Sequence, residues 1–300
     1  MSDMSDAKLS KNSRTLRGLL GPIVLCSVGM GLLVFGGALT AKADPVFDRF
    51  IAEVREEAAA QGISERHLAN LDRLTPEPEI TRLASSQPEY VKPIWAYLDH
   101  LITPNRLTLG RENLNAYRPY LDKLEAQYGV PVGILVAIWG VETNYGSNKG
   151  SFHVLQALAT LGYEGRRAKF GRQQLLAALQ ILQSGDVTIN NFYGSWAGAM
   201  GHTQFIPTTY LAYAADGTGD GKRDVWTSPQ DALASTANYL KVSGWQRGMP
   251  WGFEVVLPEN FDYGVAGLDQ RAPAARWHER QVHPARGEKQ LADSLGEMSL

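Results

Sequence analysis

The sequence contains one cysteine, Cys26, which excludes a disulfide bond within the chain and any metal site built from several thiolates. It also lacks clusters of basic residues, since 29 Lys and Arg are offset by 31 Asp and Glu and the formal net charge is −2. Binding to nucleic acid needs basic side chains gathered on one face, so we expect no nucleic-acid partner. Internal repeats and low-complexity tracts are absent. The hydrophobic content of 44% over 300 residues is typical of a globular protein with one or two domains.

Residues 1–43 have the features of a targeting segment. Basic residues precede an apolar run over residues 19–39, and the small residues of Ala-Lys-Ala occupy positions 41–43. One interpretation is a signal peptide cleaved before Asp44. The other is an uncleaved anchor, because the run approaches the roughly 20 residues that span a bilayer. Both interpretations place the protein in the periplasm, either soluble or tethered to the inner membrane, with membrane contact only through this segment.

The spacing of apolar residues predicts helices along most of the chain. Residues 44–105 are expected to form a helical lobe. A helix over residues 112–128 follows, in which Pro119 introduces a kink and after which Gly129 ends the helix. Three more helices are expected, two that end at glycines and one that begins with a capping box: residues 151–161 before Gly162, residues 167–184 before Gly185, and residues 229–243 after Ser228.

Residues 132–141 are almost wholly apolar and predict a short helix that is buried on all sides. Extended structure has little support, since residues 253–257 alternate only partly between apolar and polar side chains. Residues 194–201 have room for short extended pieces. Trp245 and Trp251 are expected to belong to the core. The predicted fold class is therefore mainly α, of the α+β type, with a small β element.

Glu142 follows this apolar helix directly. Partial desolvation beside Trp139 and Val141 and the negative end of the helix dipole should both raise the pKa of its carboxyl group. A carboxylic acid that keeps its proton near neutral pH can act as a general acid on a glycosidic oxygen. The alternative is a surface glutamate with no chemical role.

Residues 194–210 combine glycines with hydroxyl, amide and aromatic side chains. Aromatic faces stack on sugar rings, amides and hydroxyls bind the polar edges, and glycines allow close approach of the backbone. A tight turn before a helix would have a similar composition. His202 lies in this segment, and a packing or binding role is favoured for it over a role as catalytic base, because no Ser/His/Asp order surrounds it.

Three segments together resemble the membrane-bound lytic murein transglycosylase B family: WGVETNYG at residues 139–146, GAMGHTQF at 198–205 and STANYL at 235–240. The resemblance extends from about Val46 to the end of the chain. It implies a catalytic core related to goose-type lysozyme over residues 106–300, with an additional helical lobe. It also implies cleavage of the β-1,4 bond between N-acetylmuramic acid and N-acetylglucosamine in peptidoglycan, without water, to leave 1,6-anhydromuramic ends.

The resemblance also implies roles for individual residues. Glu142 would be the single catalytic group, first as acid and then as base. Ser195 and Gln204 match positions that hydrogen-bond the substrate, and Tyr239 matches a tyrosine that lines the same cleft. Three further residues of these motifs are expected to line the substrate site, namely Tyr145, Met200 and Phe205. Because the family's domain continues past the equivalent of Leu300, we expect this domain to be truncated at its C-terminus.

Residues 216–224 read DGTGDGKRD and place oxygen-bearing side chains at positions 1, 3, 5 and 9 of a loop with glycine at position 6, as in an EF-hand. Position 12 is Thr227 where an EF-hand has Glu. The family has a variant loop closed by a later aspartate, and the resemblance implies a structural Ca²⁺ or Na⁺ within residues 216–231, held by Asp216, Thr218, Asp220, the carbonyl group of Lys222, and Asp231. The alternative is a solvated Asp/Gly turn in which the last aspartate only caps a helix.

No organic cofactor is expected, and the predicted partners are peptidoglycan glycan strands and proteins of cell-wall synthesis. Two other functions stay open beside the transglycosylase. One is a peptidoglycan-binding protein without turnover, because part of the cleft wall is missing, and the other is a hydrolytic lysozyme. A calcium-dependent scaffold would rest on residues 216–231 alone.

Overall fold

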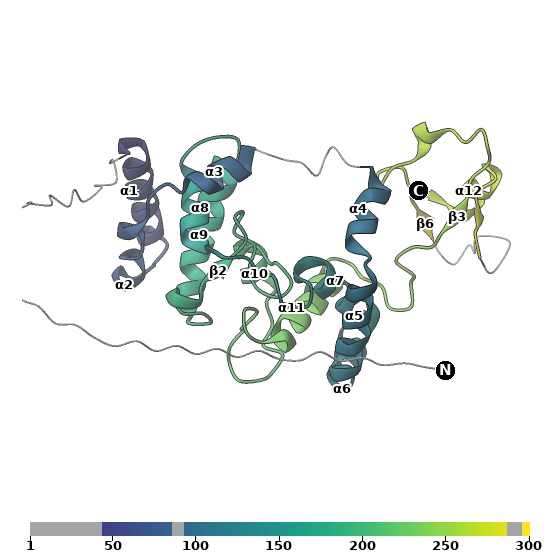
Figure 1. Cartoon of the computed structure of the whole chain (residues 1–300), viewed down its shortest axis with the longest axis horizontal. Coiled ribbons are helices and arrows are strands. Elements are labelled where there is room, and N and C mark those ends of the chain that lie inside the picture. The colour runs from purple at the N-terminus through teal and green to yellow at the C-terminus, as the bar shows by residue number, and fades with distance from the viewer. Residues whose placement is uncertain (1–43, 86–92, 287–295) are drawn as a thin grey trace, which may run out of the picture. The chain divides into compact units, whose positions relative to one another are not determined.

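The computed structural model describes residues 44–85, 93–286 and 296–300, and the predicted targeting segment lies outside this range (Figure 1). The longer helices are α1 (Pro45–Ala60), α5 (Pro104–Ala116), α6 (Arg118–Tyr128), α7 (Val132–Thr143), α8 (Val154–Tyr163), α9 (Ala168–Ser184) and α11 (Pro229–Val242). The shorter ones are α2 (Glu65–Leu68), α3 (Pro78–Ser85), α4 (Ile94–Leu101), α10 (Pro207–Tyr213), α12 (Ala274–Glu279) and the 3₁₀ helices η1 (Leu71–Arg73), η3 (Ile189–Asn191) and η4 (Tyr263–Val265). The strands have two residues each: β1 (Phe152–His153), β2 (Tyr193–Gly194), β3 (Val255–Val256), β4 (Ala272–Pro273), β5 (His283–Pro284) and β6 (Glu297–Met298).

Within the described residues, no single helix is both long and apolar enough to cross a membrane. Helices α6 and α7, bent by 112° at the break between them, reach that length and hydropathy only together.

Helix α1 packs against α8 and α9. The carboxylate of Asp44 caps it by accepting hydrogen bonds from the backbone N–H groups of Val46 and Phe47. The buried residues of α1 are Phe47, Phe50, Val54 and Ala58, and they pack in one hydrophobic cluster with buried residues of α8 and α9. The predicted division between a helical lobe at residues 44–105 and a catalytic domain from residue 106 stays a prediction. That boundary falls within the first turn of α5.

Helices α8 and α9 lie side by side because glycines face each other at their contact (Figure 1). A Cβ atom placed on Gly171 would come within 2.4 Å of the backbone nitrogen of Gly162. The prediction that Gly162 ends its helix is therefore wrong, since this glycine lies inside α8 and allows the close approach. Gly185 does end α9 in the left-handed conformation, as predicted.

Two predictions for the region before Glu142 need correction. The expected kinked helix over residues 112–128 is two helices, α5 and α6, which meet at Tyr117, because Pro119 suits the first turn of a new helix better than a helix interior. Helix α7 is not buried on all sides, since Val141 is 45% exposed while Leu135 and Trp139 are buried. The buried face packs with α6 and α11 in a second hydrophobic cluster.

Within the part of the chain that the structure describes, the strands form three antiparallel pairs, β1 with β2, β3 with β5 and β4 with β6. The pairing of Phe152 with Gly194 joins the segment after α7 to the glycine-rich segment. The other two pairs surround a small separate cluster centred on Phe261 and Trp277. The partial strand pattern over residues 253–257 corresponds to β3. Trp251 is 79% exposed, so its predicted place in the core is wrong.

Candidate functional site

Glu142 lies in the last turn of α7, one residue before the helix ends. Asn144 and Tyr145, which follow the helix end, both have positive φ angles, 49° and 59°. Asparagine adopts left-handed backbone at small cost after a helix, whereas for tyrosine this backbone is costly and persists only where surrounding contacts enforce it. The turn that presents Glu142 is therefore held by its neighbours rather than by local preference.

The carboxyl group of Glu142 has no hydrogen bond or ion pair with the residues that the structure describes. The residue is exposed by surface area, yet the atoms around the carboxyl group desolvate it partly. This desolvation raises the pKa of Glu142 above its ordinary value, as predicted from the apolar helix. The arrangement suits an acid that is accessible to a ligand and keeps its proton to a higher pH than a free glutamate.

Two side-chain hydrogen bonds join the end of α7 to the glycine-rich segment. The buried hydroxyl of Thr143 donates to the backbone oxygen of His202 over 2.6 Å, and the Nε1–H group of Trp139 donates to His202 Nδ1 over 3.0 Å. Burial, followed by the charge of Lys149, lowers the pKa of His202 to about 4. His202 is therefore a neutral packing residue, which agrees with the interpretation that it is no catalytic base.

Ser195 and Gln204 lie on a tight loop whose ends are bridged through Met200, which pairs with both Gly194 and Phe205. The hydroxyl of Ser195 accepts a hydrogen bond from the backbone N–H of Ala199. Gln204 has a positive φ of 54°, and its side-chain amide donates to the backbone oxygen of Gly201 over 3.0 Å. Both side chains are partly exposed and so keep surface for a ligand.

The other predicted substrate residues differ in their surroundings. Tyr239 on α11 is 39% exposed and packs edge-on against Phe205, with ring centroids 6.1 Å apart. Phe205 is 6% exposed and Met200 is fully buried, so both side chains pack in the core, and their place in the substrate site stays a prediction. Tyr145 is partly exposed, and its hydroxyl donates to the backbone oxygen of Arg106.

The contacts bring three sequence segments together. Thr143 follows Glu142 and is bonded to His202, which precedes Gln204 by two residues, and Phe205 in turn packs against Tyr239. Glu142, the loop of residues 194–205 and the exposed tyrosine of α11 therefore share one region of the molecule. The sequence analysis did not identify the structural role of Thr143. A local signal existed, because a threonine three residues before a glycine can close a turn by accepting a hydrogen bond from the glycine N–H, as Thr143 does from Gly146.

Asp231 organises the loop at residues 216–231. Its carboxylate is buried and accepts hydrogen bonds from the backbone N–H groups of Gly217, Thr218 and Asp224. Burial raises the pKa of Asp231 despite these bonds. The backbone N–H of Asp231 donates to the hydroxyl of Ser228, which confirms the predicted helix cap. A buried carboxylate with a raised pKa is a group that a cation would stabilise in its charged form.

Carboxylate oxygens of Asp216, Asp220 and Asp231 lie within 4.8 Å of one another. Oxygen ligands of Ca²⁺ lie about 2.3–2.6 Å from the ion, so this separation fits three ligands of one cation. Asp216 also accepts hydrogen bonds from the backbone N–H groups of Gly219 and Gly221. These bonds hold the loop in shape, and they are also the bonds expected of a solvated Asp/Gly turn.

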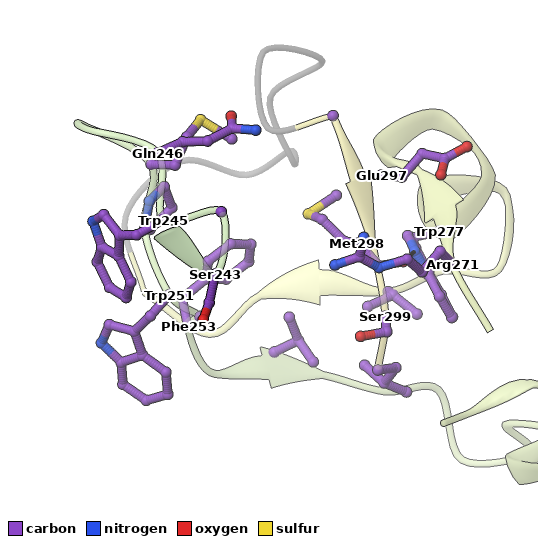
Figure 2. A pocket seen from close by; sticks show the side chains of 18 residues that line it. Ser243, Trp245, Gln246, Trp251, Phe253, Arg271, Trp277, Glu297, Met298 and Ser299 are labelled. Atoms are coloured by element: carbon purple, nitrogen blue, oxygen red, sulfur yellow. Dashed lines mark hydrogen bonds between the residues drawn. The ribbon is translucent and has the colours of Figure 1, made fainter. Parts of the chain in front are cut away.

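A cavity of about 940 Å³ lies between the end of α11 and strand β6 (Figure 2). Its lining includes Trp251 and Phe253 from one side and Arg271 and Glu297 from the other. None of the predicted catalytic, substrate-binding or metal-binding residues lines it.

Comparison with known proteins gives a consistent result. Residues 46–300 match the family described as Transglycosylase SLT domain. The chain is similar to the membrane-bound lytic murein transglycosylase B of Escherichia coli (strain K12), with 40% identity over 190 residues. That match covers 59% of this chain and 52% of the relative, so the chain spans about half the length of this curated relative.

Solved structures are similar over more of the chain. SltB3 from Pseudomonas aeruginosa, in complex with NAG-NAM-pentapeptide, is 47% identical with a TM-score of 0.80, and the match covers 85% of this chain and 69% of that one. The Escherichia coli lytic transglycosylase SLT35, in complex with calcium, is 29% identical with a TM-score of 0.71, and the match covers 85% and 79%. These likenesses confirm the predicted mainly α, lysozyme-like fold.

Proposed function

Because the chain belongs to the transglycosylase SLT family, we propose that it is a lytic transglycosylase that cleaves the β-1,4 bond between N-acetylmuramic acid and N-acetylglucosamine in peptidoglycan, with Glu142 as its single catalytic group. The observation that carries the proposal is the isolated carboxyl group of Glu142, which has a raised pKa and stands at the end of α7. The similar SltB3 structure is a complex with NAG-NAM-pentapeptide, which supports this substrate class.

The chemistry uses one carboxyl group twice, first as a proton donor and then as a proton acceptor. Protonated Glu142 donates its proton to the glycosidic oxygen as the bond to the muramoyl C1 breaks, and the N-acetylglucosamine leaves with a free hydroxyl. The carboxylate then accepts the proton of the muramoyl 6-hydroxyl while the oxygen of that group bonds to C1 and forms the 1,6-anhydro ring. Glu142 ends protonated and ready for the next cycle. The 2-acetamido group or nearby dipoles stabilise the positive charge in between.

Ser195, Gln204 and Tyr239 are the residues that we expect to bind the sugars beside Glu142. The first two are partly exposed residues of one loop that carry a hydroxyl and an amide, and Tyr239 is an aromatic residue with 39% of its surface exposed. Polar groups that fix ring edges and an aromatic surface under the ring are the usual means of binding carbohydrate. Tyr145 completes the proposed site from the turn after α7.

The loop at residues 216–231 is proposed to hold a structural Ca²⁺ or Na⁺ through Asp216, Thr218, Asp220, Asp231 and the carbonyl group of Lys222. When bound, the cation would offset the charge of the buried Asp231 and hold the loop at the start of α11, the helix that carries Tyr239. The protein is further proposed to act in the periplasm, where its substrate lies, and to meet proteins of cell-wall synthesis there.

The test is digestion of purified peptidoglycan by the wild-type chain and by Glu142→Gln, followed by mass analysis of the soluble products. Glutamine keeps the shape of the side chain and removes its acid function. We expect anhydro-ended fragments from the wild type and a loss of turnover of at least about 10²-fold in the variant, the usual contribution of a general acid. Glu112→Gln, on the exposed face of α5, is the control and should leave turnover unchanged.

The products distinguish the alternatives. Fragments that carry only reducing ends would indicate a hydrolytic lysozyme. Co-sedimentation of the wild-type chain with insoluble peptidoglycan, without release of fragments, would indicate a binding protein. Turnover that Glu142→Gln leaves intact would remove Glu142 from the site.

A further inference from the structure

Thr143 lies next to Glu142, in the last turn of α7, and is only 1% exposed. Its hydroxyl donates to the backbone oxygen of His202 over 2.6 Å and accepts from the backbone N–H of Gly146 over 2.9 Å. Its own backbone oxygen accepts from the N–H of Asn148 over 3.0 Å. Thr143, the residue beside Glu142, thus links the turn after α7 to the glycine-rich segment through bonds to Gly146, Asn148 and His202.

The residue at the far end of the Thr143 bond is itself held firmly. The backbone N–H of His202 donates to the backbone oxygen of Val225 over 2.9 Å, and its ring accepts from Trp139. The bond to Val225 anchors the backbone of His202 outside α7, and the Thr143 hydroxyl connects the helix end to this anchored residue. The tether also acts on a turn with two left-handed residues, Asn144 and Tyr145, of which the tyrosine needs surrounding contacts to keep this backbone.

We propose that Thr143 is a positioning residue for Glu142, whose hydroxyl sets the distance between the acid and the loop that carries Ser195 and Gln204. The inference rests on the proposed function of Glu142. Thr143 does not touch the substrate and acts only through the backbone of α7. A catalytic acid must reach its acceptor within hydrogen-bond distance, and displacement by about 1 Å can lower the rate about 10²-fold.

The direct test compares Thr143→Val with Thr143→Ser. Valine keeps the volume and removes the hydroxyl, and serine keeps the hydroxyl and removes a methyl group. We expect Thr143→Val to lower kcat on peptidoglycan by roughly 10²-fold with KM changed less than about threefold, because orientation and not binding is lost. Thr143→Ser should retain kcat within about fivefold of the wild type on the same reasoning.

Thr160→Val is the matched control. Thr160 on α8 is 4% exposed, and its hydroxyl also accepts from a backbone N–H, that of Glu77, and donates to a backbone oxygen, that of Gln156. Its replacement removes the same kinds of bond away from Glu142. We expect Thr160→Val to lower Tm about as much as Thr143→Val and to leave kcat unchanged. Equal losses of kcat in the two variants would overturn the proposal, as would a kcat for Thr143→Val within about threefold of the wild type.

A second measurement does not need turnover. The titration of the Glu142 carboxyl, followed by carbon NMR, should move toward the range of an ordinary glutamate in Thr143→Val and stay unchanged in Thr160→Val. If the titration of Glu142 is the same in Thr143→Val as in the wild type, Thr143 does not position Glu142. This result can be obtained even if the chain releases no peptidoglycan fragments, so a failure of the positioning role is distinct from a failure of the proposed function. If Thr143→Val does not fold, Thr143→Cys, with a weakly donating thiol, replaces it in both measurements.

Discussion

The replacement Gly140→Ala tests whether the turn beside Glu142 depends on an unusually close contact. A Cβ atom on Gly140 would lie 2.5 Å from the hydroxyl oxygen of Tyr145 and 2.6 Å from the ring carbon that bears it. The ring cannot yield freely, because its hydroxyl donates to the backbone oxygen of Arg106 and its edge packs against Trp139. We therefore expect this alanine to destabilise the protein although alanine is the better helix former.

The magnitude follows from opposing contributions. If the Tyr145 ring stays, overpacking costs about 1–3 kcal/mol. If it moves, it loses a hydrogen bond worth about 1 kcal/mol and an aromatic contact worth about 1 kcal/mol. The gain in helix propensity from glycine to alanine offsets about 1 kcal/mol of either cost. The net loss is about 0–2 kcal/mol with a central value of about 1 kcal/mol, which lowers the Tm of a chain of this size by roughly 2–4 °C.

Gly133→Ala on the same helix is the control. A Cβ atom on Gly133 would meet nothing within 4 Å, so this variant should gain up to about 1 kcal/mol. Urea unfolding, read by tryptophan fluorescence, compares the two variants directly. A Gly140→Ala variant as stable as Gly133→Ala would refute the reasoning. Tyr145→Phe offers a further check. In Gly110→Ala the Cβ atom would lie 2.5 Å from the same hydroxyl oxygen and 3.3 Å from the ring, so removal of the hydroxyl in a double variant with Tyr145→Phe should relieve that clash.

Three other predictions concern pH, metal and helix packing. Because burial lowers the pKa of His202 to about 4, the unfolded chain takes up its proton first as the pH falls below the ordinary value of 6.5. The free energy of unfolding should therefore fall by up to about 3 kcal/mol between pH 6.5 and pH 4. The fall should be smaller in His202→Gln. Thermal unfolding that shows the same pH dependence for the wild type and for His202→Gln would contradict this prediction. Addition of Ca²⁺ should raise the Tm of the wild type, and EDTA should reverse the rise. The Tm of Asp220→Ala should rise less. If calorimetry finds the same rise in Tm for the wild type and for Asp220→Ala, Asp220 does not belong to the metal site. Gly171→Ala should lower the free energy of unfolding by about 1–3 kcal/mol, because its Cβ would lie 2.4 Å from the backbone of α8. Gly133→Ala is the control, because its Cβ would meet no atom within 4 Å and the variant therefore shows the effect of a methyl group without a clash. Chemical denaturation that finds Gly171→Ala as stable as the wild type would contradict the packing argument.

Sequence patterns identified the helices with strong local signals. The capping box at Ser228 and the left-handed glycines after α6 and α9 are contacts within a few residues, so local sequence was enough to place them. Gly162 misled because a glycine that ends a helix and a glycine that lets two helices touch look the same in one sequence. The break between α5 and α6 at Tyr117 was missed because Pro119 is compatible with either a kink or a new start.

The candidate site divides in the same way. The apolar residues before Glu142 and its place at a helix end are local facts, and they were sufficient to predict a raised pKa for its carboxyl group. That Met200 is buried while Gln204 keeps an exposed surface depends on which side of the loop faces the core, and no periodic pattern reveals this in so short a segment.

The sequence by itself determined the place of the Glu142 carboxyl group at the end of an apolar helix, the composition of the 194–205 loop and the acidic pattern of the proposed cation site, because each is a matter of residue type and short spacing. Only the tertiary structure decided that Thr143 reaches His202, since hydrogen bonds between residues 59 positions apart depend on how the intervening chain packs. The physical reason is that helix caps are settled within one turn, whereas the relative position of α7 and the 194–205 loop depends on β1 pairing with β2 and on the cores of α8, α9 and α11.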